Sequence, residues 1–565
     1  MTQKRLIALV GAFAIFASAC GGTTATPPPA GSQDPGASAS TAPDSELADE
    51  QILRLSLGSE DPHSLDPAIA ETSTDIAILH GLNRGLLYFD KDQNAIPALA
   101  EDMPVASEDG LTYTFTLRDA NYSNGEKIVA GDLVYAWKRL IDPRTAAAYG
   151  AIIQDVEGGA EILGLAEGAT DADIDAAMDK FGVAAPDDKT FVVTLDHPTS
   201  YFPYLASLWG TAPYQEKWIT SANPTEAENY VSSGPFKMKS WTHQSELVIE
   251  PNPEYYGEKP TLQEIRFKIG GDPAADQASF EAGELDMLAA SPPDVPRIKA
   301  DPELGPLVVT QPTLIFDYWG FDTTKGPTAN KAFRRALNMA IDKETMMATV
   351  YGGQGVVAGS AVPPNMPGHQ PDLGLPYDVE AAKAELATAL QELGFASAAD
   401  VPPLSFGFNT NAGHEETSAF MQEQWRTNLG IESELKGVTF DIFVVERPQL
   451  KYSIARNAWG ADYPHPDNFL RVLFQSQSGN NDEGYNNPEY DRLIAEAGAE
   501  LDFDASIALY NQAQQILVDD APAVFTRWRV SNYEVRPWVT GVQGTGQDSN
   551  VIGDLFYETI KILKH

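Results

Sequence analysis

Hydrophobic and polar residues alternate with a period of two in residues 111–117 (LTYTFTL), the pattern of a strand with one buried face. Further predicted strands are 51–57, 190–195, 247–251, 264–269 and 523–530. The segments with apolar residues at helical spacing are 74–87, 131–140, 329–349, 379–393, 415–429, 488–501 and 504–518. Because strands and helices are mixed along most of the chain, the pattern predicts an α/β fold.

Residues 1–20 carry the features of an export signal. Lys4 and Arg5 precede an apolar stretch, 6–16, which is too short for a helix across a bilayer core of ~30 Å. Ala17-Ser18-Ala19-Cys20 resembles a bacterial lipoprotein box, in which the chain is cut before the cysteine and the thiol is lipidated. The alternative is an ordinary signal peptide with an incidental cysteine. Cys20 is the only cysteine, which excludes an intrachain disulfide and a cysteine-based metal site.

The segment from 20 to 50 is predicted to be a lipidated cysteine followed by a disordered tether. It consists of small and polar residues, with Leu47 as the one large apolar side chain, and cannot bury enough surface to offset its ordering entropy. The remaining chain is longer than a single hydrophobic core supports, since cores stop growing near ~250–300 residues. Several lobes are therefore expected.

Acidic residues strongly outnumber basic ones, with 80 Asp and Glu against 38 Lys and Arg and a net charge of −42. This excess argues against nucleic acid or anionic lipid as the main partner. We interpret the charge as that of a soluble, exposed surface protein, and a preference for cationic ligands is the alternative interpretation.

A series of short motifs follows a specific order along the chain. The motifs are Ser64-Leu65-Asp66-Pro67, 85–88 (GLLY), 97–101 (PALAE), 111–118 (LTYTFTLR), 122–125 (YSNG), 134–139 (VYAWKR), 252–256 (NPEYY), 282–286 (AGELD) and 562–565 (ILKH). Together with 456–464 (RNAWGADYP), they resemble the solute-binding proteins that take peptides and nickel for ABC importers. The oligopeptide-binding branch fits best, and the resemblance covers residues 52–565.

The resemblance implies a two-lobed, type II periplasmic-binding-protein fold with an extra α/β domain on the first lobe. The first lobe would combine 52–84, 209–315 and 529–565, the extra domain would be 85–208, and the second lobe 316–528. The chain would cross between lobes near residues 315 and 528, and the lobes would close around the ligand by a hinge. Residues 1–19 would be the signal peptide.

A binder of short peptides with varied side chains must recognise their free ammonium, their free carboxylate and their main chain. By the resemblance, Asp462 would bind the ammonium, because a partly buried carboxylate is a strong partner for a cation. The main chain would pair with strand-like edges at Ala458, Trp459 and Gly460 on one side and at 71–73, which includes Glu71 and Ser73, on the other. The alternative for Asp462 is a solvated loop aspartate.

The ligand carboxylate needs a cation, and three positions match those of the family. Arg456, Arg447 and His414 would hold carboxylates at different depths, which would admit peptides of about two to five residues. The alternatives are surface ion pairs for the two arginines and a polar loop residue for His414.

Aromatic residues would line the side-chain pockets. By the resemblance these are Tyr149, Trp459, Phe440 and Trp528, although any aromatic side chain can instead belong to a core. Gly460 stands where enteric peptide binders have a disulfide cysteine, so this chain departs from their pattern.

Other function classes receive less support from the residues. The chain contains no Gly-x-Ser-x-Gly, no phosphate loop and no His-Glu-x-x-His motif, so we expect no enzyme. No cofactor or metal is expected either, since the calcium-loop-like residues 90–101 have Ala95 where the turn needs glycine. The alternatives left open are a nickel chelate, sugar or opine ligand on the same fold, and a peptide-sensing lipoprotein.

The resemblance thus predicts a monomeric, lipid-anchored protein outside the cytoplasmic membrane or in the periplasm. It would capture short peptides and deliver them to the permease subunits of an ABC importer.

Overall fold

The computed structural model describes residues 46–166 and 168–565. The predicted signal peptide, Cys20 and most of the predicted tether lie outside the described residues. Within the described part, no helix is long and apolar enough to cross a membrane.

A four-stranded sheet near the N-terminus combines distant parts of the chain. Its strands, in spatial order, are β1 (Ile52–Ser56), β10 (Glu264–Lys268), β9 (Glu246–Pro251) and β8 (Phe236–Thr242). Strand β1 runs parallel to β10, and the other neighbours are antiparallel.

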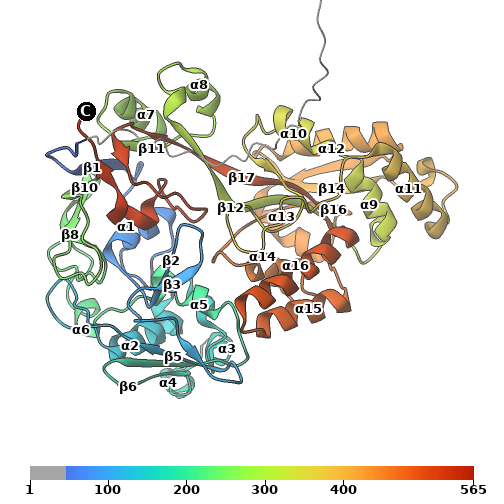
Figure 1. Ribbon diagram of the computed structural model, residues 1–565. Coiled ribbons are helices and arrows are strands. Elements are labelled where there is room, and N and C mark those ends of the chain that lie inside the picture. The colour runs from blue at the N-terminus through green and yellow to red at the C-terminus, as the bar shows by residue number, and fades with distance from the viewer. Residues whose placement is uncertain (1–45, 167) are drawn as a thin grey trace, which may run out of the picture. The chain divides into compact units, whose positions relative to one another are not determined.

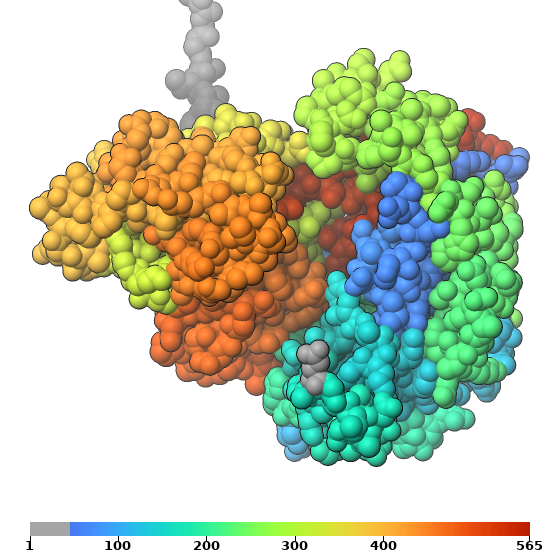
Figure 2. Space-filling model, turned by 180° about the vertical axis from the view of Figure 1, so that it is seen from behind, coloured from blue at the N-terminus to red at the C-terminus, as the bar shows by residue number. Residues whose placement is uncertain are grey.

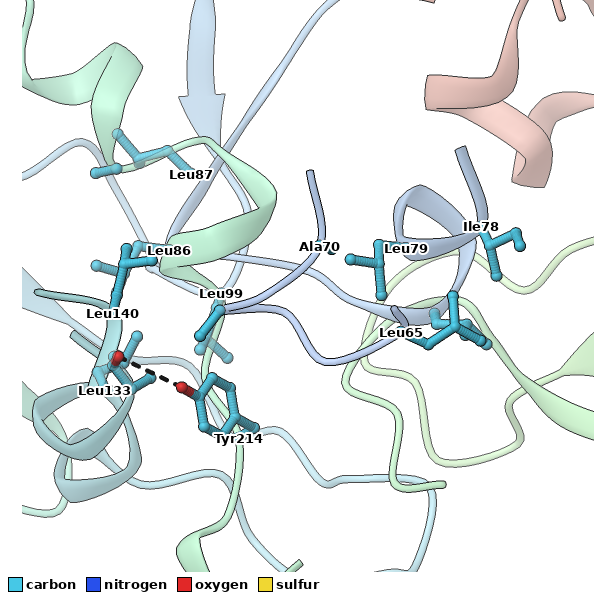
Figure 3. Close-up of a cluster of buried hydrophobic side chains, with 14 of the residues drawn as sticks. Leu65, Ala70, Ile78, Leu79, Leu86, Leu87, Leu99, Leu133, Leu140 and Tyr214 are labelled. Carbon is cyan, nitrogen blue, oxygen red and sulfur yellow. Dashed lines mark hydrogen bonds between the residues drawn. The ribbon is translucent and has the colours of Figure 1, made fainter. Parts of the chain in front are cut away.

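Helix α1 (Ser73–Leu82) packs closely on this sheet. A Cβ atom at Gly81 would lie 2.9 Å from Ile249 Cδ1, which shows how closely the helix approaches the sheet at this crossing. Figure 3 shows buried side chains around α1, among them Leu65, Ile78 and Leu79, and the hydrogen bond that the Tyr214 hydroxyl donates to the Ala136 main chain. This packing holds α1 against the sheet, and the Thr72–Asp75 capping box orders its N-terminal end, which is important for the site described below.

A second four-stranded sheet forms between residues 105 and 194. Its order is β4 (Val105–Ala106), β5 (Thr112–Thr116), β7 (Thr190–Thr194) and β6 (Val183–Asp187), all antiparallel. Helix α2 (Ala130–Ile141) covers it, with Trp137 packed against Phe191 at 5.3 Å between ring centroids. The smaller elements of this part are the hairpin β2 (Leu87–Phe89) and β3 (Ala95–Pro97), α3 (Gly159–Leu163), α4 (Asp171–Met178), α5 (Phe202–Leu205) and α6 (Glu216–Ile219).

The largest sheet has seven strands and contains the two longest strands described. Its order is β11 (Met287–Ala289), β17 (Ala523–Val535), β12 (Val308–Phe321), β16 (Ile454–Gly460), β14 (Leu404–Asn409) and β15 (Ser433–Val438), with β13 (Val356–Val357) on β17. Figure 1 shows β12 and β17 running side by side from the region of β11 to that of β14 and β16. Residues 315 and 528, the expected crossings, lie within these two strands.

Helices cover both faces of this sheet. Phe316 and Tyr318 pack into one core with α14 (Asp467–Phe474), α15 (Pro488–Ala499) and α16 (Phe503–Asp520). On the other face, Trp319 and Phe321 pack with α9 (Lys331–Met339), α11 (Val379–Leu393) and α12 (His414–Leu429). The remaining α-helices are α7 (Pro273–Glu281), α8 (Val295–Ala300), α10 (Lys343–Thr349) and α13 (Phe440–Glu446), and the remaining strands are the pair β18 (Val539–Thr540) and β19 (Lys561–Ile562).

The predicted helix 329–349 is wrong as a single element, because the chain forms two helices there. Helix α9 ends at Met339, and Asp342 begins α10 by accepting a hydrogen bond from the Thr345 amide at 3.0 Å. The predicted helix 74–87 is also too long: it stops at Leu82, because Asn83 adopts an extended conformation.

Candidate functional site

A cavity of about 550 Å³ brings together five of the residues that the sequence analysis selected, Glu71, Ser73, Tyr149, Gly460 and Asp462. They come from the N-terminal end of α1, the chain after α2 and the end of β16. Figure 2 shows a hollow in the surface with residues of the C-terminal part, in red, at its floor. The cavity is therefore assembled from segments that lie far apart in the sequence.

The Asp462 carboxylate has no cationic partner in the part of the chain that the structure describes. Its Oδ2 accepts a hydrogen bond from Asn468 Nδ2 at 3.2 Å, and Asn468 also accepts from Trp459 Nε1 at 2.8 Å. Burial raises the pKa of Asp462, and no Lys, Arg or His of the described residues forms an ion pair with it. Burial raises the pKa of Tyr149, and the negative charge of Asp462 raises it further. The geometry suits an incoming ammonium, which would replace the solvation that Asp462 has lost.

Strand β16 has a partly free edge in this region. On one side Ala458, Trp459 and Gly460 pair with β12. On the other side β14 pairs only as far as Ala455, so residues 456–460 have no strand partner there among the pairs that the structure describes. Main-chain groups on such an edge can pair with an extended ligand.

The chain at 71–73 offers less free backbone than the sequence analysis expected. Thr72 caps α1, and the amides of Glu71 and Thr72 both donate to Asp75 Oδ2, at 3.2 and 3.1 Å. Ser73 is already the first residue of the helix. The side chains of Glu71 and Ser73 line the cavity, but two of the local N–H groups are already used by the helix cap.

A second cavity, of about 430 Å³, contains Arg456 and His414. Arg456 makes no ion pair among the described residues, and its Nε is buried without a hydrogen-bond partner. Burial lowers its pKa, and the neighbouring Arg529 and Arg447 lower it further against the opposing effect of Asp317. Burial and then Arg456 lower the pKa of His414 to about 4, so its imidazole is neutral at neutral pH. Arg456 is thus a half-buried cation that lacks a carboxylate partner among the described residues, whereas His414 can offer only a neutral hydrogen-bond donor.

Arg447 is already paired. Its Nε lies 2.7 Å from Asp482 Oδ2, and its Nη1 donates to Asn457 Oδ1 at 2.9 Å. The structure therefore places it in the ion pair that the sequence analysis named as the alternative to ligand binding.

The four selected aromatic residues lie in different environments. Tyr149 and Trp459 line a further cavity of about 520 Å³ together with Asp462. Phe440 is 61% exposed at the start of α13 and lines none of these three cavities. Trp528 is only 2% exposed, packs edge to face on His369 at 4.9 Å, and belongs to a core. The structure brings Tyr149 and Trp459 to Asp462, but it does not bring Phe440 or Trp528 there.

The sequence analysis missed three charged residues of the second cavity, Asp317, Arg527 and Arg529. A signal for the arginines was present, because residues 523–530 were predicted as a strand and side chains two apart on a strand share a face. Asp317 lies in β12, which the analysis did not predict.

A buried carboxyl group near Arg447 gives a test by pH. Burial and the neighbouring Asp482 raise the pKa of Glu483 to about 8, whereas an unfolded chain returns it to ~4.3. The folded state therefore binds more protons between these values, and stability falls as pH rises through this window. We expect Glu483→Gln to increase the free energy of unfolding at pH 7 by about 2–3 kcal/mol, measured by urea denaturation.

The gain from Glu483→Gln should disappear near pH ~3, below the unfolded-state pKa, where Glu483 is protonated in both states. The exposed Glu258→Gln provides a matched control that should change little at either pH. An equal gain at both pH values would contradict the assignment of a buried, protonated carboxyl group.

Comparison with known proteins defines the class of this fold and site. The family model described as "Bacterial extracellular solute-binding proteins, family 5 Middle" matches residues 94–481. The oligopeptide-binding protein OppA of Bacillus subtilis (strain 168) is 31% identical over 487 residues, which cover 83% of this chain and 86% of that protein. The periplasmic oligopeptide-binding protein OppA of Salmonella typhimurium is 30% identical over 582 residues, covering 100% and 99%.

Solved structures agree with the sequence relatives. The murein tripeptide-binding protein MppA in its unliganded open form aligns with a TM-score of 0.82 at 27% identity, covering 93% of this chain and 99% of that one. Haemophilus influenzae OppA in complex with the peptide RPPGFSPFR aligns with a TM-score of 0.63 at 28% identity, covering 92% and 100%.

The fold is thus the two-lobed type II fold of extracytoplasmic solute-binding proteins, as the sequence resemblance predicted. The chain belongs to family 5 of the bacterial extracellular solute-binding proteins, and its relatives place it among the peptide-binding members that serve ABC transporters. These relatives are solute-binding proteins and not enzymes.

Proposed function

We propose that this protein captures short peptides with free termini between its two lobes and delivers them to the permease of an ABC importer. The observation that carries the proposal is a pair of unmatched charges on one segment: Asp462 has no cation and Arg456 has no carboxylate among the described residues. A zwitterionic ligand would supply both missing partners.

The free edge of β16, from Arg456 to Gly460, is long enough for an extended peptide. A strand advances ~3.3 Å per residue, so the four steps from Arg456 to Gly460 correspond to ~13 Å. This is the length of about four extended residues, within the range of two to five residues expected from the family. The ligand would lie along the free edge of β16 and hydrogen-bond to its main chain, which explains how varied side chains are accepted.

Roles for the other selected residues follow from their positions. Tyr149, Trp459, Ser73 and Glu71 would surround the first ligand residues, because their side chains line cavities that also contain Asp462. His414 would donate a hydrogen bond to the ligand carboxylate beside Arg456. Arg447 would act by orienting Asn457 and by the charge it places near the cavity. Phe440 and Trp528 would contribute only after a rearrangement of their surroundings.

Closure would involve the two long strands. We assign 52–84, 209–315 and 529–565 to the first lobe, 85–208 to the extra domain and 316–528 to the second lobe. Bending of β12 and β17 near residues 315 and 528 would then move one lobe against the other. The break in β12–β17 pairing between Pro312 and Phe316 supports a hinge at this level.

The protein would be a lipid-anchored monomer at the outer face of the cytoplasmic membrane or in the periplasm. The lipoprotein-like box at Cys20 and the polar segment after it support this anchor. We expect Cys20→Ala to shift the protein from the membrane pellet to the soluble fraction of fractionated cells, with unchanged peptide affinity. Retention of the variant in the pellet would contradict a lipid anchor on this thiol.

The direct test of peptide capture is native mass spectrometry of the purified, unlipidated protein, followed by release and identification of the bound molecules. A mixture of short peptides would support the proposal and would give the preferred length. A single non-peptide mass, such as a nickel chelate, sugar or opine, would overturn the ligand while leaving the fold intact. An empty protein would be titrated with peptides of two to five residues, and failure of all of them would refute the proposal.

A further inference from the structure

The second cavity holds an excess of positive charge inside a strongly acidic protein. Its charged lining residues are Asp317, Arg456, Arg527 and Arg529, which we call the arginine cavity together with the neutral His414. Three guanidinium groups thus face one carboxylate. Because the whole chain carries a net charge of −42, this local excess does not follow from composition.

Strand pairing fixes these side chains on one face of the sheet. Asp317 stands opposite Arg527 on β17 and opposite Ala458 on β16. Arg456 stands opposite Trp319, two residues beyond Asp317, and Arg529 lies two residues from Arg527. Side chains two apart on a strand, and those directly opposite across a pair, share a face. The cluster is therefore part of the sheet, and its members are not independent surface residues.

Asp317 already interacts with two of the three arginines. Its Oδ1 lies 2.6 Å from Arg529 Nη2, and its Oδ2 lies 3.0 Å from Arg529 Nε and 2.7 Å from Arg527 Nε. Burial alone would raise the pKa of Asp317, but these arginines hold it below its usual value, so it is ionised. One negative charge can compensate only one of the two cations that it contacts.

The arginine side chains are held in place without a ligand. The guanidinium of Arg527 lies over the Tyr351 ring at 4.0 Å, and its Nη1 donates to the Gln354 main-chain oxygen at 3.1 Å. Both arginines on β17 keep N–H groups that Asp317 does not use. The cavity is thus arranged to receive anionic oxygens with little further ordering.

One ligand carboxylate does not neutralise the positive charge of the arginine cavity. Three arginines and one aspartate give a net charge of two positive units, and the peptide carboxylate expected at Arg456 cancels one of them. The remaining unit belongs to a pair of partly buried guanidinium groups, where an uncompensated charge is costly.

We propose, resting on the peptide-binding function above, that the arginine cavity selects ligands with two carboxylates close together at the C-terminal end. These are peptides with Glu or Asp as the last or next-to-last residue. The α-carboxylate binds Arg456, and the side-chain carboxylate binds the free N–H groups of Arg527 and Arg529. Charge therefore determines the preference for acidic residues at the C-terminal end, whereas the rest of the site binds the main chain of the peptide.

The test compares isosteric peptides by isothermal titration calorimetry of the full mature protein freed of bound ligand. The pairs are Ala-Ala-Ala-Glu with Ala-Ala-Ala-Gln, and Ala-Ala-Glu-Ala with Ala-Ala-Gln-Ala, and Ala-Ala-Ala-Ala is the reference. In at least one pair, we expect the Glu peptide to bind at least tenfold more tightly than the Gln peptide. In Arg527→Gln and Arg529→Gln this ratio should fall to about twofold or less, with the affinity for Ala-Ala-Ala-Ala within about threefold of wild type.

Two further variants distinguish an effect of charge on the affinity ratio from a general loss of structure. Asp317→Asn removes the internal counterion, so the Glu-to-Gln ratio should rise in this variant. Arg426→Gln removes an exposed, ion-paired arginine of α12 and should leave the ratio unchanged. Thermal melting of each variant checks that it is folded.

The outcomes distinguish this inference from the function on which it rests. If all five peptides bind wild type without a preference for Glu, or if the ratio survives in both arginine variants, the inference is overturned and peptide capture stands. If none of the peptides binds, peptide capture itself is refuted and the inference falls with it.

Discussion

Asp462→Ala is expected to weaken the binding of a peptide with a free N-terminal amine by roughly 100-fold, corresponding to about 3 kcal/mol. The carboxylate is partly buried, interacts with Asn468 and has no cationic partner among the described residues, so the ligand ammonium would be its main electrostatic partner. The variant removes that partner and leaves the ammonium in a partly desolvated cavity. Calorimetric titration of Ala-Ala-Ala-Ala gives the change directly.

The control for Asp462→Ala is a ligand whose N-terminal amine is blocked. An N-acetylated tetrapeptide has no ammonium, so its affinity should be nearly the same in wild type and in Asp462→Ala. Asp504→Asn changes an exposed carboxylate of α16 that lines none of the three cavities, and it should affect neither peptide. Equal losses for free and acetylated peptides would mean that Asp462 supports the fold of its loop and does not bind the ammonium.

The second large effect is expected at the opposite end of the ligand. Arg456→Gln should weaken a peptide with a free C-terminal carboxylate by roughly 100-fold, because Arg456 is half-buried and no carboxylate of the described residues pairs with it. A C-terminally amidated peptide should lose much less. Titration of the amidated and free forms of one tetrapeptide against wild type and variant measures the difference.

Arg447→Gln provides a matched comparison with Arg456→Gln. Arg447 already pairs with Asp482, so its removal should cost less ligand affinity and more stability than the change at Arg456. Equal losses of affinity in the two variants would mean that Arg447 binds the ligand carboxylate in spite of its pairing with Asp482. Both arginines would then share the ligand carboxylate.

Local sequence predicted the strands whose alternation marks one buried face, but it missed β12, which is buried on both faces along its second half. The strands at 111–117 and 190–195 pair in register, with Phe115 opposite Phe191, because their alternation marks a single inner face. Strand β12 gave no such signal, since its last eight residues, LIFDYWGF, are buried or nearly so on both faces and form an almost continuous apolar run. The break between α9 and α10 was missed because the apolar spacing continues across it, while the cap of Asp342 is a local hydrogen bond.

The candidate site was predictable in its residues and not in their environments. Asp462, Gly460 and Tyr149 came from the family resemblance, and the structure places them around one cavity. The pairing of Arg447 with Asp482 depends on a contact between residues 35 apart, which no periodic pattern contains. Likewise, the burial of Trp528 is decided by strand β13 and by His369 in segments remote in sequence.

The free edge of β16 has a consequence for the kinetics of binding. The residues proposed to bind the ammonium, the main chain and the carboxylate all lie within 456–462, so a peptide could make its main polar contacts before any closing movement. Association would then be the encounter of a peptide with a surface that is already formed, while closure would lengthen the residence time. Substitutions that stiffen or loosen β12 and β17 should therefore change the dissociation rate constant and leave the association rate constant nearly constant.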